Sequence, residues 1–196
     1  MRYIREMARK PEFDRDDAVT AAADTFWEKG YAATSLDDLT GRLGIGRASL
    51  YNAFGDKRAL FIEALSSYLD NGREVLRDAL ASRLTGREAL ALLVEGRACC
   101  NGRSGKGCLA VNVGVELNGT DQQIQHAIVG ELERVEDTVL ALIRRGQADG
   151  SIRAELDAAG AARAFMALIV GMQSMKRIGM PPDVIMGAAR AQLAML

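Results

Sequence analysis

The stretch that decides the fold is residues 34–60, TSLDDLTGRLGIGRASLYNAFGDKRAL, because it encodes two short helices joined by a tight turn. Thr34 and Ser35 stand before the first helix, where their hydroxyl oxygens can accept the free N–H groups of its opening turn. Gly44 stands after it, where a sharp turn favours a residue that tolerates positive φ. Leucines at helical spacing indicate the first helix itself: Leu36, Leu39 and Leu43. The pattern predicts a helix-turn-helix.

The second helix, predicted over residues 46–54, has an apolar face and a polar face. Leu50 and Phe54 fall on the inner face. Arginine, serine, tyrosine and asparagine side chains bond base edges and phosphates, so a short face of these types fits a DNA major groove. The spacing alone also fits any all-helical protein that packs two short helices around a glycine. The outer face carries Arg47, Ser49, Tyr51 and Asn52.

The run TSLDDLTGRLGIGRASLYNAFGDKRALFIEAL resembles the N-terminal domain of the TetR/AcrR transcriptional regulators. Counting helices along the whole chain, the resemblance lies in the Thr34 that opens helix two (the first of the pair), the Gly-Ile-Gly turn, Leu-Tyr followed by Phe three positions on, and the Asp-Lys that begins helix four. It implies a double-stranded DNA operator as partner. It also implies that seven residues line the DNA: Thr34, Arg47, Ala48, Ser49, Tyr51, Asn52 and Lys57.

The composition is compatible with this interpretation. With 196 residues, of which 48% are hydrophobic, the chain can bury a real core. A net charge of −1 argues against non-specific coating of nucleic acid, although a sequence-specific binder needs only a local basic patch. Residues 1–10 carry three arginines and one lysine against one glutamate, and this arm either follows a phosphate backbone or is a solvated tail.

The helical spacing of apolar residues and the positions of helix-breaking residues predict an all-α chain of about nine helices. Only three prolines occur, and glycines separate the periodic segments. The first helix should begin near Asp14, with Phe13 as a hydrophobic staple, and Asp56 should cap the fourth. We expect Leu92 inside the fifth helix's packed face, and Glu131 on the polar face of the seventh. The predicted domains are a DNA-binding domain, residues 1–55, and an effector-binding and dimerisation domain, residues 56–196.

The three cysteines, Cys99, Cys100 and Cys108, are too few for a disulfide scaffold and are expected as thiols. Periodicity leaves residues 108–117 as either strand or helix. The Gly-Cys-Leu that opens this segment, with Glu-Leu further on, resembles a subgroup of TetR-type repressors, some of which sense electrophiles or oxidants through that thiol. The resemblance favours a helix.

Cys108 is also a sensor candidate on chemical grounds. A thiol at the first turn of a helix, with Arg103 and Lys106 nearby, should have its thiolate favoured by the helix dipole and the cations, whereas burial would cancel this. We predict that Cys108 senses, with Cys99 or Cys100 as resolving thiol. A small-hydrophobe role is the alternative. A metal site is disfavoured by poor ligand spacing, and no cofactor is expected.

Small and apolar residues cover almost the whole of residues 157–178, more than one small body can bury. Together with the apolar stripe after Pro181-Pro182, they predict a homodimer through helices eight and nine, as in the family. Arg163 and Lys176-Arg177 argue against a membrane helix here, and without a signal peptide the protein is expected to be cytoplasmic. Candidates for lining a small apolar or electrophilic effector, with core packing as the alternative, are Phe165, Met166 and Met172.

The sequence therefore predicts a dimeric, one-component transcriptional regulator, most simply a ligand-released or thiol-released repressor, and not an enzyme. Two rivals from other classes remain. One is a thiol-dependent enzyme centred on Cys108, which lacks a nearby His or acid partner in the sequence. The other is a helical adaptor whose helix-turn-helix binds protein.

Overall fold

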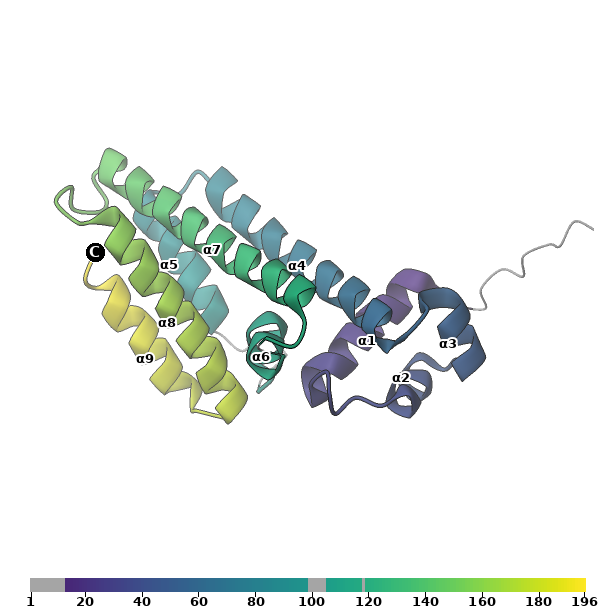
Figure 1. Ribbon diagram of the computed structural model, residues 1–196. Helices are drawn as coiled ribbons and strands as arrows, with labels where there is room; N and C mark the ends of the chain where they lie inside the picture. The colour runs from purple at the N-terminus through teal and green to yellow at the C-terminus, as the bar shows by residue number, and fades with distance from the viewer. Residues whose placement is uncertain (1–12, 99–104, 118) are drawn as a thin grey trace, which may run out of the picture. The chain divides into compact units, whose positions relative to one another are not determined.

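The structure is a computed structural model that describes residues 13–98, 105–117 and 119–196. The described residues form nine helices and no strand, which confirms the predicted all-α class (Figure 1). By contacts the chain divides inside α4 into two units, Met1–Ser67 and Tyr68–Leu196, later than the boundary expected at residue 55. The helices are α1 (Arg15–Lys29), α2 (Leu36–Leu43), α3 (Arg47–Phe54), α4 (Lys57–Ala81), α5 (Gly86–Ala98), α6 (Leu109–Glu116), α7 (Gln122–Asp149), α8 (Ala158–Ile178) and α9 (Pro182–Leu193).

In the first unit, α1 begins where the sequence predicts, directly after Asp14. The Asp14 carboxylate caps it by accepting from the backbone N–H groups of Asp16 and Asp17 at 2.8 and 3.1 Å. The helix ends at Gly30, whose φ of 88° suits glycine. The unit's core is built of fully buried large side chains contributed by all four helices that enter it: Phe26, Leu39, Leu50, Leu60 and Phe61.

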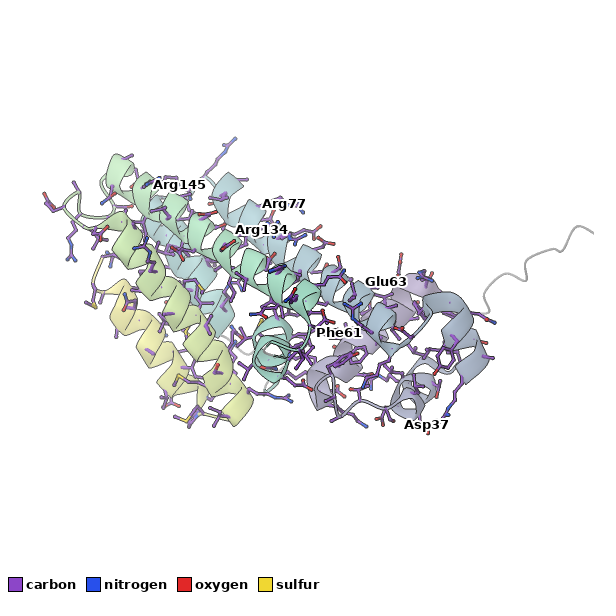
Figure 2. The ribbon with its side chains drawn as sticks, viewed as in Figure 1. Asp37, Phe61, Glu63, Arg77, Arg134 and Arg145 are labelled. Atoms are coloured by element: carbon purple, nitrogen blue, oxygen red, sulfur yellow. The ribbon has the colours of Figure 1, made fainter. Side chains whose placement is uncertain are left out.

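Aromatic rings join α1 to the start of α4. The Phe26 and Phe61 rings meet edge to face with centroids 4.9 Å apart. The centroid of the Tyr31 ring lies 6.0 Å from that of Phe26 and 4.8 Å from that of Phe61. Phe61 is labelled in Figure 2. Trp27 is buried. Trp27 and Tyr31 therefore pack within the first unit.

The second unit has a continuous hydrophobic core formed by the second part of α4 with α5, α7, α8 and α9. The core face of α5 consists of Ala89, Leu90, Leu93 and Val94. Leu92 is 64% exposed, so its predicted burial is wrong. At 100° per residue, position 92 lies away from the stripe that these four residues form.

Glu131 of α7 is buried. The prediction that it lies on the solvated polar face of this helix is therefore wrong. Its Oε2 accepts from Arg73 Nε at 2.9 Å and from Arg134 Nη1 at 3.4 Å. The hydrogen bond to Glu131 raises the pKa of Arg73. A charge on α7 can be buried here because α4 supplies its partner.

The far end of α4 is also fixed to α7. Arg145 of α7 donates from Nη1 to the carbonyl oxygens of Leu80 and Ser82 at 3.1 and 3.2 Å. These carbonyls end α4, where a cation is favoured by the helix dipole. Figure 2 labels Arg145 at this end of α7. The part of α4 in the second unit is thus held along its length.

Among the described helices, α8 has the length and apolar composition that a membrane-crossing helix requires. The core helix of a protein that never meets a bilayer meets the same requirement. Phe165, Ile169 and Met172 of α8 are buried in the hydrophobic core of the second unit. Burial covers 28% of the apolar stretch of α8, so most of this stretch lies on the surface of the single chain.

The start of α5 touches the backbone of α7 without an intervening side chain. A Cβ atom added at Gly86 would lie 2.1 Å from the Gly146 nitrogen and 2.4 Å from the Leu142 carbonyl oxygen. Backbone atoms cannot turn away as a flexible side chain can. Glycine is therefore required at Gly86 by the close approach of the two helices.

We predict opposite effects for two alanine substitutions in α5. Gly86→Ala should lower the free energy of unfolding by about 1–3 kcal/mol or more, because it overpacks the contact with α7. Gly96→Ala is the matched control, since an added Cβ there meets nothing within 4 Å and alanine favours a helix. Urea unfolding followed by circular dichroism measures both. Equal stability of the two variants would contradict the close contact.

Candidate nucleic-acid interface and thiol site

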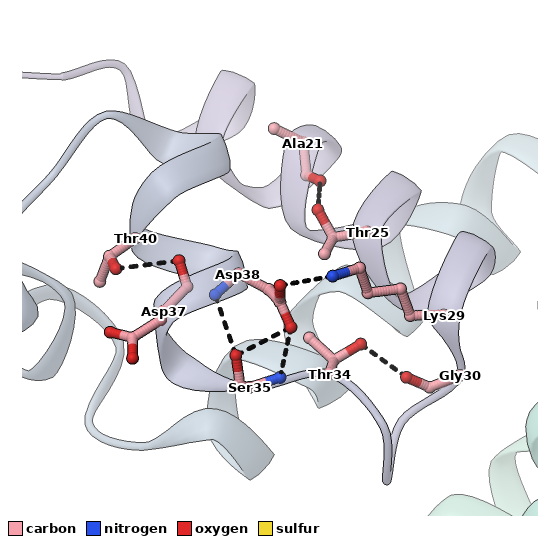
Figure 3. Close-up of polar contacts among 9 residues, drawn as sticks. All are labelled: Ala21, Thr25, Lys29, Gly30, Thr34, Ser35, Asp37, Asp38 and Thr40. Atoms are coloured by element: carbon pink, nitrogen blue, oxygen red, sulfur yellow. Dashed lines mark hydrogen bonds and ion pairs between the residues drawn. The ribbon is translucent and has the colours of Figure 1, made fainter.

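The start of α2 is fixed by a capping box (Figure 3). The Ser35 hydroxyl accepts from the Asp38 backbone N–H at 3.1 Å, and the Asp38 carboxylate accepts from the Ser35 backbone N–H at 2.9 Å. Asp38 also forms an ion pair with Lys29 of α1. The Lys29 hydrogen bond, with those from Ser35, holds the pKa of Asp38 well below its usual value. The ion pair thereby joins the end of α1 to the start of α2.

Thr34 differs from the prediction. Its side chain is buried and its hydroxyl donates to the Gly30 carbonyl oxygen at 2.6 Å (Figure 3), so Ser35 provides the cap by itself. Gly30 reverses the chain after α1 and leaves that carbonyl without a helical partner. The Thr34 hydroxyl closes the turn and does not face outward. That Thr34 lines the DNA stays a prediction.

The turn between α2 and α3 follows the sequence closely. Gly44 adopts the left-handed conformation with φ 66°, and its N–H donates to the Thr40 carbonyl. Ile45 is half-buried at the corner. Gly46 then precedes α3 as its N-cap residue. The two helices form the predicted helix-turn-helix.

The two faces of α3 also lie as predicted. Leu50 and Phe54 are buried, and Tyr51 is 47% exposed. The polar outer face therefore projects into solvent from a helix whose apolar side is anchored in the core. The other outward residues are Arg47, Ala48, Ser49 and Asn52.

Arg15 of α1 holds the end of α3, a role that the sequence analysis missed. Its Nη1 donates to the Ala53 carbonyl at 2.6 Å, and its guanidinium carbon lies 4.5 Å from the centre of the Phe54 ring. The other edge of the guanidinium binds both oxygens of Glu63 at 2.9 and 2.7 Å. The partners lie far away in the sequence, so no local signal could have revealed this clamp.

Phe13 packs across the unit as well. Its ring centroid lies 6.1 Å from that of Phe54, so Phe13 contacts α3 directly. The sequence predicts Phe13 as a hydrophobic staple on α1. Phe13 does precede the Asp14 cap of α1, but its aromatic contact is with Phe54 of α3 and not with a residue of α1.

Lys57 stands at the first position of α4, after the Asp56 cap, whose carboxylate accepts from the Ala59 N–H at 2.7 Å as predicted. Lys57 itself is half-buried. Its ammonium lies 4.6 Å from the centre of the Tyr31 ring and donates to the Ala32 carbonyl at 3.4 Å. The ammonium is thus held near a helix N-terminus, where anions are favoured.

Cys108 lies at the N-cap of α6, so the predicted helix is confirmed and the thiol stands at its start. The Tyr68 hydroxyl of α4 donates to the Cys108 sulfur at 3.4 Å. Burial, with the neighbouring thiol, raises the pKa of Tyr68, and the phenol therefore keeps its proton at neutral pH. Cys108 is itself half-buried.

The loop before Cys108 is held against α6 and α8. The Asn112 side chain donates to the Lys106 carbonyl at 2.8 Å. Gly107 has φ 66°, and a Cβ there would lie 2.5 Å from the Gln173 carbonyl oxygen of α8. A positive φ and this close approach both require glycine. Cys108 thus lies where α4, α6 and α8 meet.

The remaining predicted effector residues divide into three groups. Cys99 and Cys100, proposed as resolving thiols, lie outside the described residues, as does Arg103. Phe165 and Met172 are buried members of the hydrophobic core, which is the packing alternative. Met166 is half-buried on α8. The described thiol site therefore consists of Cys108 and Tyr68.

An anchored helix-turn-helix with an exposed polar second helix, followed by a separate helical unit, defines a transcriptional regulator of the helix-turn-helix class. Residues 18–64 match the model of the bacterial regulatory proteins of the tetR family, and residues 91–192 match the tetracyclin repressor-like C-terminal domain. The chain belongs to the TetR family.

Individual relatives agree with this assignment. The helix-turn-helix regulator YezE of Bacillus subtilis is 31% identical over 76% of this chain and 78% of its own length. The repressor ComR of Escherichia coli is 28% identical over 94% and 90%. A solved structure of the TetR-family regulator CifR, a cysteine mutant complexed with 26 bp operator DNA, has a TM-score of 0.83 and 30% identity, covering 95% of this chain and 98% of that one.

The capping box gives a prediction about pH. Because the folded-state pKa of Asp38 lies below that of the unfolded chain, ionised Asp38 stabilises the first unit above the usual aspartate pKa of about 4. This contribution is lost as the pH falls through the folded-state value. Asp38→Asn should therefore be less stable than wild type at neutral pH, and the difference should shrink in acid.

Urea unfolding followed by the fluorescence of Trp27, the single tryptophan of the chain, measures this difference. Asp16→Asn is a suitable control, because Asp16 is an exposed carboxylate of the same unit, in the first turn of α1. A difference between Asp38→Asn and wild type that stays constant from about pH 7 to about pH 3 would contradict the ion pair and capping box.

Proposed function

We propose that this protein is a dimeric repressor that binds a palindromic operator through α3 and is released by a small molecule or by modification of Cys108. The observation that carries the proposal is the exposed polar face of α3 on an anchored helix-turn-helix. The relative CifR, which is complexed with operator DNA in its solved structure, supports the same use of this fold.

The side chains of α3 suggest a division of roles. Arg47 can fork to a guanine edge, and Asn52 and Ser49 can bond base edges or phosphates. Ala48 is small enough to let the helix approach the groove closely. Tyr51 of α3 and Lys57 of α4 can contact phosphates, which fix the register of a protein on the duplex. A two-turn helix offers few base contacts, so each should matter.

A second copy of the chain is the proposed partner of α8 and α9. Both helices keep small residues exposed, including Ala164 and Ala167 of α8 and Gly187 of α9. Ile178 and Met195 add apolar surface, being 77% and 62% exposed. A two-fold axis would pair such faces and give two reading helices on half-sites about one helical turn apart, or a multiple of it.

The thiol site offers a route for release. Tyr68 belongs to α4, the helix that begins in the first unit and ends in the second. In the reaction that we propose with an α,β-unsaturated carbonyl, the Cys108 sulfur forms a bond to the β-carbon and the thiol proton ends on the α-carbon. The adduct would displace the Tyr68 hydroxyl from the sulfur. A state with α4 shifted would then bind DNA less well.

Arg47→Ala should lower operator affinity by about ten- to a hundredfold, because a bidentate base contact is lost. Dimer mass should be unchanged. Arg77→Ala is the matched control, since Arg77 is also an exposed arginine and lies on α4, outside the helix-turn-helix. Fluorescence anisotropy with a palindrome from the DNA upstream of the gene measures affinity, and light scattering measures mass. Undiminished operator binding by Arg47→Ala would favour the protein-binding adaptor instead.

Treatment with N-ethylmaleimide should release wild-type protein from the operator, while Cys108→Ser should stay bound. The double variant Cys99→Ser/Cys100→Ser should be released like wild type. Tyr68→Phe, which lacks the hydrogen bond to the sulfur, should bind the operator more weakly even without treatment. Mass spectrometry identifies the modified residue, and the anisotropy assay measures release. Release that persists in Cys108→Ser would exclude Cys108 as the sensor.

A further inference from the structure

The proposed base-reading arginine is already held by a carboxylate of the neighbouring helix. Arg47 Nη2 lies 2.7 and 2.8 Å from the two oxygens of Asp37, and Arg47 Nε lies 3.1 Å from the nearer oxygen. Asp37 belongs to the first turn of α2. The pair therefore joins the two helices of the helix-turn-helix on their outer side.

This pair is exposed, with side-chain exposures of 60% for Arg47 and 73% for Asp37. An ion pair in that position adds little to folding stability, because water screens it. Its geometry nevertheless restricts the arginine. The guanidinium is planar, and a carboxylate that takes its Nε–Nη2 edge fixes the direction of the remaining N–H groups. The effect of the pair is on orientation.

The edge that Asp37 occupies leaves the Nη1 group for another acceptor. No acceptor for Nη1 is found among the residues that the structure describes. Guanine presents two acceptors, O6 and N7, and the two N–H groups of Nη1 are the donors that Asp37 leaves for them. Arg47 can thus bind Asp37 and a guanine edge at the same time.

The pair between Arg47 and Asp37 also changes the charge that the helix-turn-helix presents to DNA. Residues 36–54, which span α2 and α3, contain two aspartates and two arginines and are neutral in sum. Phosphate attraction is independent of base sequence and supplies most non-specific affinity. An arginine whose charge is balanced by a carboxylate attracts phosphates weakly, and that carboxylate repels them. Hydrogen bonding to a base edge is not weakened in the same way.

We infer that Asp37 is a specificity-determining residue: it orients Arg47 toward a base edge and suppresses the attraction of Arg47 to the phosphate backbone. This inference rests on the proposed function, since it requires α3 to read DNA. Asp37 acts through Arg47 and is a positioning residue. Selectivity for the operator then comes partly from Asp37, because this residue weakens binding to all other DNA sequences.

Asp37→Asn tests the inference. The affinities for the operator and for a scrambled duplex of equal length are measured over a range of salt concentrations. We expect tighter binding to the scrambled duplex, a salt slope steeper by about 0.9, and a fall of about tenfold in the ratio of operator to scrambled affinity. Asp37→Glu, which keeps a carboxylate, should restore most of the ratio.

Two controls separate orientation from total charge. Glu155→Gln removes one exposed negative charge from the loop between α7 and α8, and should leave the ratio unchanged. In the Arg47→Ala background, adding Asp37→Asn should no longer alter the ratio, because the residue to be oriented is absent. Unfolding followed by Trp27 fluorescence confirms that each variant folds.

The outcomes are distinguishable. If Asp37→Asn raises the operator and scrambled affinities equally, Asp37 merely masks a cation, and the specificity role is overturned. An unchanged ratio with an unchanged salt slope overturns it too. If wild-type protein does not prefer its own upstream palindrome over the scrambled duplex, the proposed function itself fails, and this inference falls with it.

Discussion

The attachment of α3 to the core of the first unit is the constraint on which the rest depends. A helix of eight residues is not stable alone in water, since nucleation is unfavourable and few hydrogen bonds follow. Leu50 and Phe54 bury one side of α3, and Arg15 binds its last turn while also binding Glu63 of α4. With the inner side so occupied, only the polar side remains for a partner.

In the second unit, polar contacts hold α4 to the helices of the body. Tyr68 bonds the sulfur of Cys108 at the start of α6, Arg73 pairs with the buried Glu131, and Arg145 binds the carbonyls at the end of α4. Removing one member of a buried pair leaves an uncompensated polar group. Such a pair is therefore either fully formed, or broken in a conformation that gives both groups other partners. A helix held this way suits a two-state regulator, because an event at one contact favours one arrangement over another.

Local features of the sequence predicted local structure well, and long-range partners explain the misses. The Ser35 and Asp56 caps, the Gly44 turn and the two faces of α3 all follow from residues within one or two turns of each other. The Arg15 clamp and the burial of Glu131 depend on partners from distant helices, which periodicity does not reveal. Thr34 was misplaced for a different reason: two adjacent hydroxyls could each cap α2, and only the fold decides which one does.

The neutrality of α2 and α3 links DNA binding to dimerisation in the proposed function. A single reading head with Arg47 balanced by Asp37 gains little from phosphate attraction, so its affinity must come from a few base contacts. Joining two such heads makes the second contact intramolecular and raises the overall affinity without any new contact. If α8 and α9 form the dimer as we propose, their exposed small-residue faces would be as necessary for operator binding as α3 is. In the proposed dimer, a change in the separation of the two heads would remove this gain, so a modest rearrangement of the body would be sufficient for release.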